Sequence, residues 1–525
     1  MACRFWMRCQ NFERLAVATM YKTPGVYINE LNAFPNSVVE VPTAVPAFFG
    51  YTETAPTPNV PTRISSLAEY LLLFGGAPKT KFTYTKGGTV APVAAGKFLL
   101  YPGIRLFFDN GGGPCWIVSV GTADADTTKK KDDFLGALTA LEKIQEPTIL
   151  VAPDAVLLDR ASWQEVCQQM IAHCAKMQSR VSILDVYSGD VARTNNDSND
   201  VITLFRNAVT DSLNYAQTYY PWVKTSVYDD TDVDFSRFDD SISVLKSDLD
   251  DEAKKLVPDA ADPKQKALLT LNALLIQAAT GTQQAKPDAG KQPEQAAAGT
   301  ASTPTPTPSQ VHRSLWQVSP LYKSVLGSIK DILNVQPPSA AMAGVYARVD
   351  AKQGVFKAPA NTGINSVLSP TVNISSEEQE DLNSPLDGKA VNAIRAFVGR
   401  GVLVWGARTL DGNSQDWRYI NVRRTIIMLE QSIKFASLAY VFEPNTPSTW
   451  VTVRNMISNF LTNQWKAGAL FGAKPEEAYN VDVGLGSTMT GNDILDGYMR
   501  VTVKVALVRP AEFIVLTFQQ KMQTS

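Results

Sequence analysis

The feature that most limits the possible folds is a regular alternation of short apolar runs and longer amphipathic segments between residues 116 and 227. The expected strands are residues 116–120, 148–152 and 181–186, the expected helices are 134–143 and 163–178, and 214–220 and 223–227 extend the pattern. A strand, a helix and a second strand in this order form a parallel pair with the helix on one face. The predicted fold class of this region is therefore α/β, with a mostly parallel sheet covered by helices on both faces.

A glycine run precedes the first of these strands. Residues 102–110 are expected to form a helix, followed by Gly111, Gly112 and Gly113 and then by a strand. A phosphate-binding loop needs the opposite order, in which a strand leads into the loop and a helix leaves it. We therefore interpret the glycines as the end of a helix, as we do Gly75-Gly76 after the helix expected at residues 65–74.

The N-terminal residues 25–51 are expected to be extended, because their prolines are incompatible with a helix interior. Val26 and Ile28, and then Val39 and Val41, alternate with polar residues as in strands. Since no hairpin partner follows, these four residues are candidates for a strand that pairs with another chain.

Residues 226–310 differ in composition from the rest of the chain. They begin acidic, contain a helical run near residues 264–279, and end in a stretch rich in Pro, Ala, Gln and Thr. Such a composition buries too little apolar surface to offset the entropy of ordering. We therefore expect a disordered loop at residues 283–310.

The segment 391–445 predicts a strand, a turn, a second strand and a long helix. Val402, Val404 and Trp405 form the second strand, and Asn421 is the expected N-cap of the helix. Arg423 and Arg424 fall in the first helical turn, where the helix dipole disfavours cations. They are therefore candidates for intersubunit contacts with acidic groups.

The last part of the chain predicts an amphipathic helix at residues 450–467, a half-exposed strand at 499–507 and a final strand at 513–518. Phe513, Val515 and Phe518 in this final strand have no local partner. They are candidates for a strand that is donated to a neighbouring subunit.

Residue types that support catalysis or metal binding are sparse. Cys167, His173 and Cys174 share a predicted helix, but a structural zinc site needs a fourth ligand, so we interpret them as core residues. Asp230, Asp232 and Asp234 resemble the start of a calcium loop, but Phe235 stands where the loop requires glycine. We predict no catalytic residues, no metal, no cofactor and no enzymatic activity.

Length and charge limit the remaining possibilities. A chain of 525 residues is expected to form two or three domains, and its five cysteines at irregular spacing do not suggest a disulfide framework. A formal charge of −2 gives no basic footprint for nucleic acid, and no apolar run is long enough to span a membrane. We expect neither nucleic acid nor a membrane as a partner.

Four blocks of sequence resemble, in order, the C-terminal domain of contractile tail sheath proteins. This family builds the sheath of contractile phage tails and of phage-derived injection particles. The blocks are residues 391–395 (VNAIR), 404–409 (VWGART), 419–424 (YINVRR) and 442–445 (FEPN). Residues 21–27 (YKTPGVY) resemble the usual opening of such a protein, so residues 1–19 are interpreted as an extension or a start-codon artefact. The order of the blocks makes the resemblance specific.

The resemblance implies a structural subunit that polymerises as stacked helical hexameric rings around an inner tube and contracts to drive the tube through a target cell envelope. The implied partners are further copies of the chain, the tube protein, and baseplate and tail-terminator proteins, with assembly in the bacterial cytoplasm. The implied particle is a phage tail or a released injection particle. Arg454 and Lys466, on the helix at 450–467, are candidates for contact with the tube.

The resemblance also implies a division into domains. Residues 20–42 and 385–525 are expected to form an α+β core domain from the two chain ends, with an α/β domain at 43–384 inserted between them. A tail terminator, a divergent secretion-sheath subunit and a hydrolase on the α/β domain are the alternatives. The hydrolase lacks a recognisable nucleophile and base.

Overall fold

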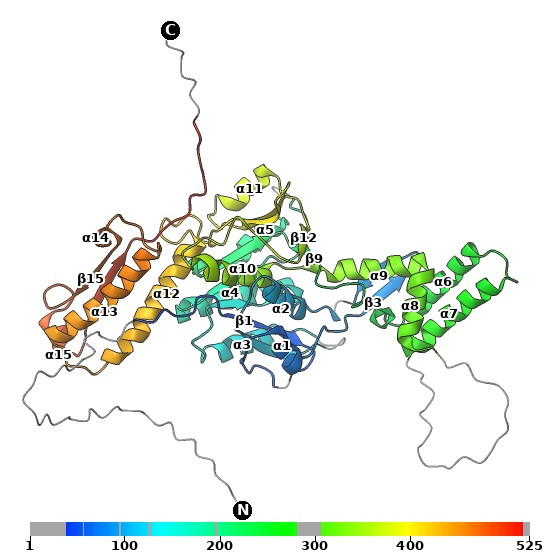
Figure 1. Cartoon of the computed structure of the whole chain (residues 1–525), viewed down its shortest axis with the longest axis horizontal. Helices are drawn as coiled ribbons and strands as arrows, with labels where there is room; N and C mark the ends of the chain where they lie inside the picture. The colour runs from blue at the N-terminus through cyan, green and yellow to red at the C-terminus, as the bar shows by residue number, and fades with distance from the viewer. Residues whose placement is uncertain are drawn as a thin grey trace, which may run out of the picture.

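A large mixed sheet forms the centre of the protein. The computed structural model describes residues 38–55, 57–93, 96–123, 128–194, 198–280 and 306–517 (Figure 1). The nine strands of the sheet lie in the order β11 (Thr362–Gly363), β14 (Gly401–Trp405), β13 (Asn392–Phe397), β8 (Ala216–Tyr220), β7 (Val181–Asp185), β6 (Ile149–Val151), β1 (Pro46–Thr52), β5 (Cys115–Thr122) and β2 (Thr62–Ile64). Neighbours from β5 to β13 are parallel, and β2, β14 and β11 pair antiparallel at the two ends.

Helices cover both faces of this sheet. Every residue of β1 is buried, as expected for a central parallel strand. Successive strand residues point to opposite faces, and the Phe48 ring lies 5.0 Å from Phe107 on α2 (Leu100–Asp109), whereas the Phe49 ring lies 6.2 Å from Phe134 on α3 (Lys131–Leu141). α10 (Ser339–Gln353) packs beside α2, and α4 (Arg160–Met177) packs beside α3. The predicted α/β fold is confirmed.

Local signals in the sequence explain where two helices end. α1 (Leu67–Phe74) begins at Ser66, whose side chain accepts from the Glu69 amide, and ends at Gly75 with φ of 80°. α2 is followed by Gly111 with φ of 95°, and β5 comes next. Because glycine adopts positive φ without a steric cost, these residues allow the chain to turn out of the helix. The glycine run therefore ends a helix, as predicted.

Two strands do not lie in the sheets that the sequence predicted for them. β9 (Val223–Thr225) leaves the main sheet and forms a three-stranded sheet with β10 (Val335–Gln336) and β12 (Val367–Pro370). β13 pairs with β8 through Asn392 and Ala393. The central sheet therefore continues past the domain boundary that we expected at residue 385.

Smaller elements surround the sheet. A lobe of helices lies at the right of Figure 1, and it contains α6 (Ile242–Leu256), α7 (Pro263–Thr280), α8 (Pro308–Val318) and α9 (Pro320–Leu333). The hairpin of β3 (Phe82–Thr85) and β4 (Thr89–Pro92) packs against α6 and α9. α5 (Val201–Ala208) and α11 (Ser376–Asn383) lie near the other end of the main sheet. Of the loop expected at 283–310, residues 308–310 belong to α8 and residues up to 305 lie outside the described part.

A second hydrophobic core lies beyond the central sheet. It is formed by α12 (Ile420–Ser437), α13 (Pro447–Lys466), β15 (Tyr479–Val483) and β16 (Val501–Val505), with the short helices α14 (Pro475–Ala478) and α15 (Gly491–Leu495) beside them. The apolar residues of α13 recur at helical spacing and face this core: Val453, Met456, Ile457, Phe460 and Leu461. The predicted amphipathic helix is confirmed.

The predicted N-cap of α12 is wrong. The helix begins at Ile420, with Tyr419 in the cap position, so Asn421 lies inside its first turn and is buried. The Asn421 side chain donates to the carbonyl oxygens of Phe356 (2.8 Å) and Val508 (3.1 Å). These distant partners replace the local capping bond on which the prediction relied.

The N-terminal segment crosses from the second core to the central sheet. Residues 38–45 form no strand, so Val39, which is 77% exposed, and Val41 are not strand residues within this chain. Val38 and Val41 pack against the second core, and the Val41 amide donates to Ser432 Oγ (3.1 Å). Residues 1–19 and the strand candidates Val26 and Ile28 lie outside the described residues.

Candidate functional site

The small sheet of the second core has open edges. β15 and β16 are antiparallel, with Val481 opposite Val503, and no further strand pairs with either of them in the described part of the chain. Their inner residues pack on α13, and the Tyr479 hydroxyl lies 2.6 Å from Thr462 Oγ1. A two-stranded sheet is marginal alone, and unpaired edges accept strands from other chains. This sheet is a candidate acceptor for an added strand.

The chain end that follows β16 is a candidate donor. The Phe471 amide donates to Ala506 O (2.8 Å), and Glu512 pairs with Arg408. Residues 513–516 then leave the body of the protein, and Phe513, Ile514, Val515 and Leu516 are 72–86% exposed. Figure 1 shows this C-terminal tail, defined here as residues 509–517, pointing away from the rest of the molecule. It is extended but forms no strand within the chain, and Phe518 lies outside the described residues.

An exposed run of four apolar residues needs a covering surface. Scattered apolar residues are common on protein surfaces, but contiguous ones mark contact sites. Residues 513–516 of the tail are extended, apolar and without a partner in the described structure, and these are the features of a strand that pairs with a second chain. The tail and the open sheet therefore have complementary properties.

Arg424 is buried and paired within its own chain, whereas we expected its acidic partner in another subunit. It is buried in the first turn of α12, and its Nη2 lies 2.5 Å from Asp350 Oδ2 on α10. The Thr43 hydroxyl also donates to Asp350 Oδ2 (2.6 Å), and Arg424 Nη2 donates to Thr43 O (3.1 Å). The acidic partner that the sequence required is supplied by this chain, 74 positions earlier.

Arg423 is also buried rather than available to a neighbour. Its guanidinium lies 3.9 Å from the centre of the Tyr215 ring and 4.7 Å from that of Trp417. Burial lowers its pKa. The aromatic faces partly offset the desolvation of the cation, since their quadrupoles attract positive charge.

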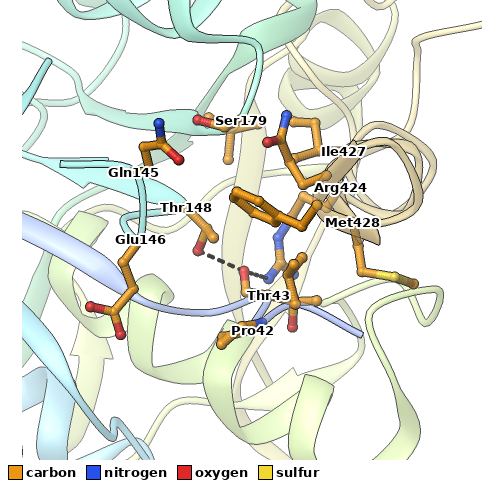
Figure 2. A pocket seen from close by; sticks show the side chains of 13 residues that line it. Pro42, Thr43, Gln145, Glu146, Thr148, Ser179, Arg424, Ile427 and Met428 are labelled. Atoms are coloured by element: carbon orange, nitrogen blue, oxygen red, sulfur yellow. Dashed lines mark hydrogen bonds between the residues drawn. The ribbon is translucent and has the colours of Figure 1, made fainter. Parts of the chain in front are cut away.

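A cavity of about 270 Å³ lies between the two cores. Figure 2 shows its lining from the N-terminal segment, from Gln145 and Glu146 before β6, and from α12, with Thr148 Oγ1 donating to Thr43 O (2.8 Å). Ile427 and Met428 make the α12 side apolar. The cavity marks the seam along which the N-terminal segment joins the two cores.

The candidates for contact with a tube are both exposed on α13. Arg454 Nη2 donates to the Val483 carbonyl oxygen (2.7 Å) at the end of β15. Lys466 is the last residue of the helix, where a cation is favoured by the helix dipole. Both side chains are accessible to a partner, and neither belongs to a buried network.

His173 and the clustered cysteines are buried, and His312 is half-buried. His173 Nε2 lies 3.2 Å from Arg180 Nη1, and burial together with the Arg180 charge lowers the His173 pKa to about 4. Cys167 and Cys174 are buried on the same helix, and burial raises the pKa of Cys174 to about 12. His312 Nδ1 lies 2.9 Å from the Tyr322 hydroxyl.

The three aspartates that resemble the start of a calcium loop each bond to a nearby group. Asp230 pairs with Lys330 (2.5 Å), Asp232 with Arg105 (3.9 Å), and Asp234 accepts from the Ser236 amide (2.8 Å). Among the described residues, no cluster of three potential ligands has the geometry to hold a metal ion. Within the same residues, no helix combines the length and apolar character needed to cross a membrane.

Two family profiles match the chain. The profile of the phage tail sheath protein central domain matches residues 299–410, and that of the phage tail sheath C-terminal domain matches residues 413–521. The tail sheath protein of Enterobacteria phage T4 is 24% identical over 163 residues, which are 30% of this chain and 25% of that protein. The chain thus spans about a quarter of the length of the curated relatives that it matches.

Two solved structures are similar over almost the whole chain. The sheath of PVC, an extracellular contractile injection system, in its contracted state is 28% identical, with a TM-score of 0.57 over 96% of this chain and 99% of that one. The helical sheath of the anti-feeding prophage in its contracted state is also 28% identical, with a TM-score of 0.57 over 96% of this chain and 100% of that one.

Proposed function

The chain belongs to the contractile tail sheath family, and we propose that it is a structural subunit of a contractile sheath. Copies of the chain would form stacked helical hexameric rings around an inner tube. The sheath would shorten as whole subunits rotate and slide into a second packing, and this movement would drive the tube through a target cell envelope. The protein is a component of a phage tail or contractile injection particle.

The observation that carries this proposal is that one chain contains both a two-stranded sheet with open edges and an exposed apolar tail. A tail strand that adds to the sheet of a second copy would contribute about 4–6 backbone hydrogen bonds at roughly 1 kcal/mol each. Phe513 and Val515 on one face, and Ile514 and Leu516 on the other, would add apolar burial. Val26, Ile28 and Phe518 remain candidates for the same kind of exchange.

A donated strand would suit a structure that changes its packing. The strand stays hydrogen-bonded to its acceptor sheet while the bodies of the two subunits move, so the copies remain linked in both states. A metastable extended packing and a more stable contracted one would then supply the work without ATP. This account supports a structural role, without catalysis and without a cofactor.

The partners follow from the same role. We propose contacts with further copies, with the inner tube through α13, and with baseplate and terminator proteins at the ends of the sheath. We further propose that residues 20–42 and 385–525 contribute the inner, tube-facing domain, apart from β13 and β14, which lie in the central sheet. We also propose that assembly takes place in the bacterial cytoplasm. Packing of Val38 and Val41 against the second core supports the first part of this division.

Electron microscopy of the purified full-length chain tests the proposal. Alone or with its tube protein, the chain is expected to form helical tubes of stacked rings. Particles that remain monomeric under every condition, with the tube protein present in excess, would contradict a sheath role.

A further inference from the structure

We propose that Arg408 and Glu512 form a clamp that fixes the root of the C-terminal tail to the central sheet. A pull on the tail from a neighbouring subunit would then reach the central domain rather than the small sheet. This inference rests on the proposed function, in which another copy holds residues 513–517. The clamp itself is a property of the single chain.

The clamp is a two-pronged, charge-assisted contact. Arg408 Nε lies 3.0 Å from Glu512 Oε1 and 3.1 Å from Oε2, and Nη2 lies 2.5 Å from Oε2. The Tyr419 hydroxyl is 3.4 Å from Oε2. The two charged side chains are only 6% and 15% exposed. Such a contact is strong and directional because two N–H groups of the planar guanidinium meet one carboxylate.

Arg408 is held by the central domain on its other sides. Its Nη1 donates to Asn383 O (2.8 Å) and Ser384 Oγ (3.1 Å). Its backbone N–H donates to Asn392 Oδ1 (2.8 Å), and Asn392 Nδ2 donates to Arg408 O (2.8 Å). Asn392 lies on β13 in the main sheet. The guanidinium is therefore a fixed anchor, and Glu512 is the group brought to it.

Glu512 is the last residue of the described tail that is bonded to the rest of the protein. The tail first leaves β16 of the second core, and the Val508 amide donates to Ala469 O (3.3 Å). Within the described tail, Glu512 is the last residue with a hydrogen bond or ion pair to the body of the protein. Without the clamp, a load on residues 513–517 would pass to Val508 in the second core. Val508 is held there by Ala469, by the Asn421 side chain of α12 and by its continuity with the two-stranded β15–β16 sheet.

The chain offers a matched control on the same tail. Arg509 pairs with Asp416, but this pair is longer at 3.8 Å, and its side chains are 51% and 81% exposed. Exposed pairs of this kind contribute little. Asp416→Asn therefore removes a charge next to the tail without removing a clamp.

The first measurement is hydrogen exchange of the full-length protein in its monomeric form. In Glu512→Gln, the hydrogen-bonded Val508 amide is expected to exchange several-fold faster than in the wild type, and by a larger factor than the amides of β13. The thermal midpoint is expected to fall, because the buried Arg408 guanidinium loses its anionic partner. Asp416→Asn is expected to behave like the wild type, and Glu512→Asp to fall between. Exchange of the Val508 amide that rises no more than that of β13 in Glu512→Gln would overturn the clamp.

The second measurement is the resistance of assembled polymers to denaturant, followed by sedimentation. Polymers of Glu512→Gln are expected to dissociate at a lower denaturant concentration than those of the wild type or Asp416→Asn. Equal resistance, despite a loosened root, would refute the transmission of load through the clamp. A chain lacking residues 513–525 that still polymerises would instead refute the proposed donation of the tail, and the exchange result on the monomer would stand independently of it.

Discussion

Arg424 on α12 and Asp350 on α10 form a nearly solvent-free ion pair, with 3.0 Å between Nη1 and Oδ1 and 2.5 Å between Nη2 and Oδ2. The side chains are 3% and 7% exposed. Thr43 bonds to both partners, and the Tyr346 ring centre lies 4.6 Å from the Arg424 guanidinium. One network therefore ties the N-terminal segment, the helical layer of the central sheet and the first helix of the second core.

Asp350→Ala is expected to destabilise the protein by about 3–5 kcal/mol, because it leaves the Arg424 charge buried without its partner. Urea unfolding measures this difference. The control is Asp251→Asn, which breaks an exposed pair with Lys254 and is expected to change the free energy of unfolding by less than about 1 kcal/mol. Equal effects of the two substitutions would show that the buried network does not join the two cores.

The lowered pKa of His173 predicts a loss of stability in acid. The folded-state pKa of about 4 lies below the ordinary value of 6.5, so the unfolded chain binds a proton that the folded chain resists. This contribution is complete above pH 6.5 and is lost as the pH falls toward 4, at no more than about 1.4 kcal/mol per pH unit. His173→Gln removes it, so the difference in unfolding free energy between wild type and variant should change between pH 7 and pH 5. A constant difference would contradict the assignment.

Arg454 and Lys466 are expected to contribute to binding of the tube. Reversal of both charges to glutamate should reduce co-assembly with the tube protein, and more strongly at low salt, where exposed charges are least screened. Lys176→Glu with Lys254→Glu changes the net charge equally on other exposed surfaces and serves as the control. Co-assembly that is unchanged at low and high salt would mean that both α13 charges only solvate the helix.

The segment between α7 and α8 is expected to be dispensable. Deleting residues 283–304 should leave folding and polymerisation intact, because its composition does not support a packed core. The comparison variant is Thr307→Ala, a substitution next to the deleted segment. It removes the capping box of Thr307 and Gln310 at the start of α8 and should lower the free energy of unfolding by about 1 kcal/mol. Loss of polymerisation in the deletion variant alone would reveal a structural role for the segment.

The parts of the fold that depend on local pattern could be predicted from the sequence. The alternation that ends in β7 and the amphipathic face of α13 follow from hydrophobic periodicity, and Gly75 from its backbone freedom. The partners of Arg408 and Arg424 could not, because Glu512 and Asp350 lie 104 and 74 positions away. Asn421 was misassigned for the same reason, since its bonds are to distant carbonyl groups.

The tail is a different case. Residues 513–516 form a short continuous apolar run, which is consistent with a strand, but a strand is defined by its partner, and no partner lies in the described part of this chain. The exposure of the four apolar residues could not be read from their pattern, because the same pattern is typical of a buried strand.

The most direct test of the account is sedimentation and electron microscopy of a chain that lacks residues 513–525. The truncation removes the exposed apolar residues of the tail and leaves both cores and the Arg408–Glu512 pair in place. We predict a folded monomer with an unchanged circular dichroism spectrum that forms no helical polymer, alone or with the tube protein. If the truncated chain assembles into contractile sheaths as the full-length chain does, donation of the tail is not what connects the subunits.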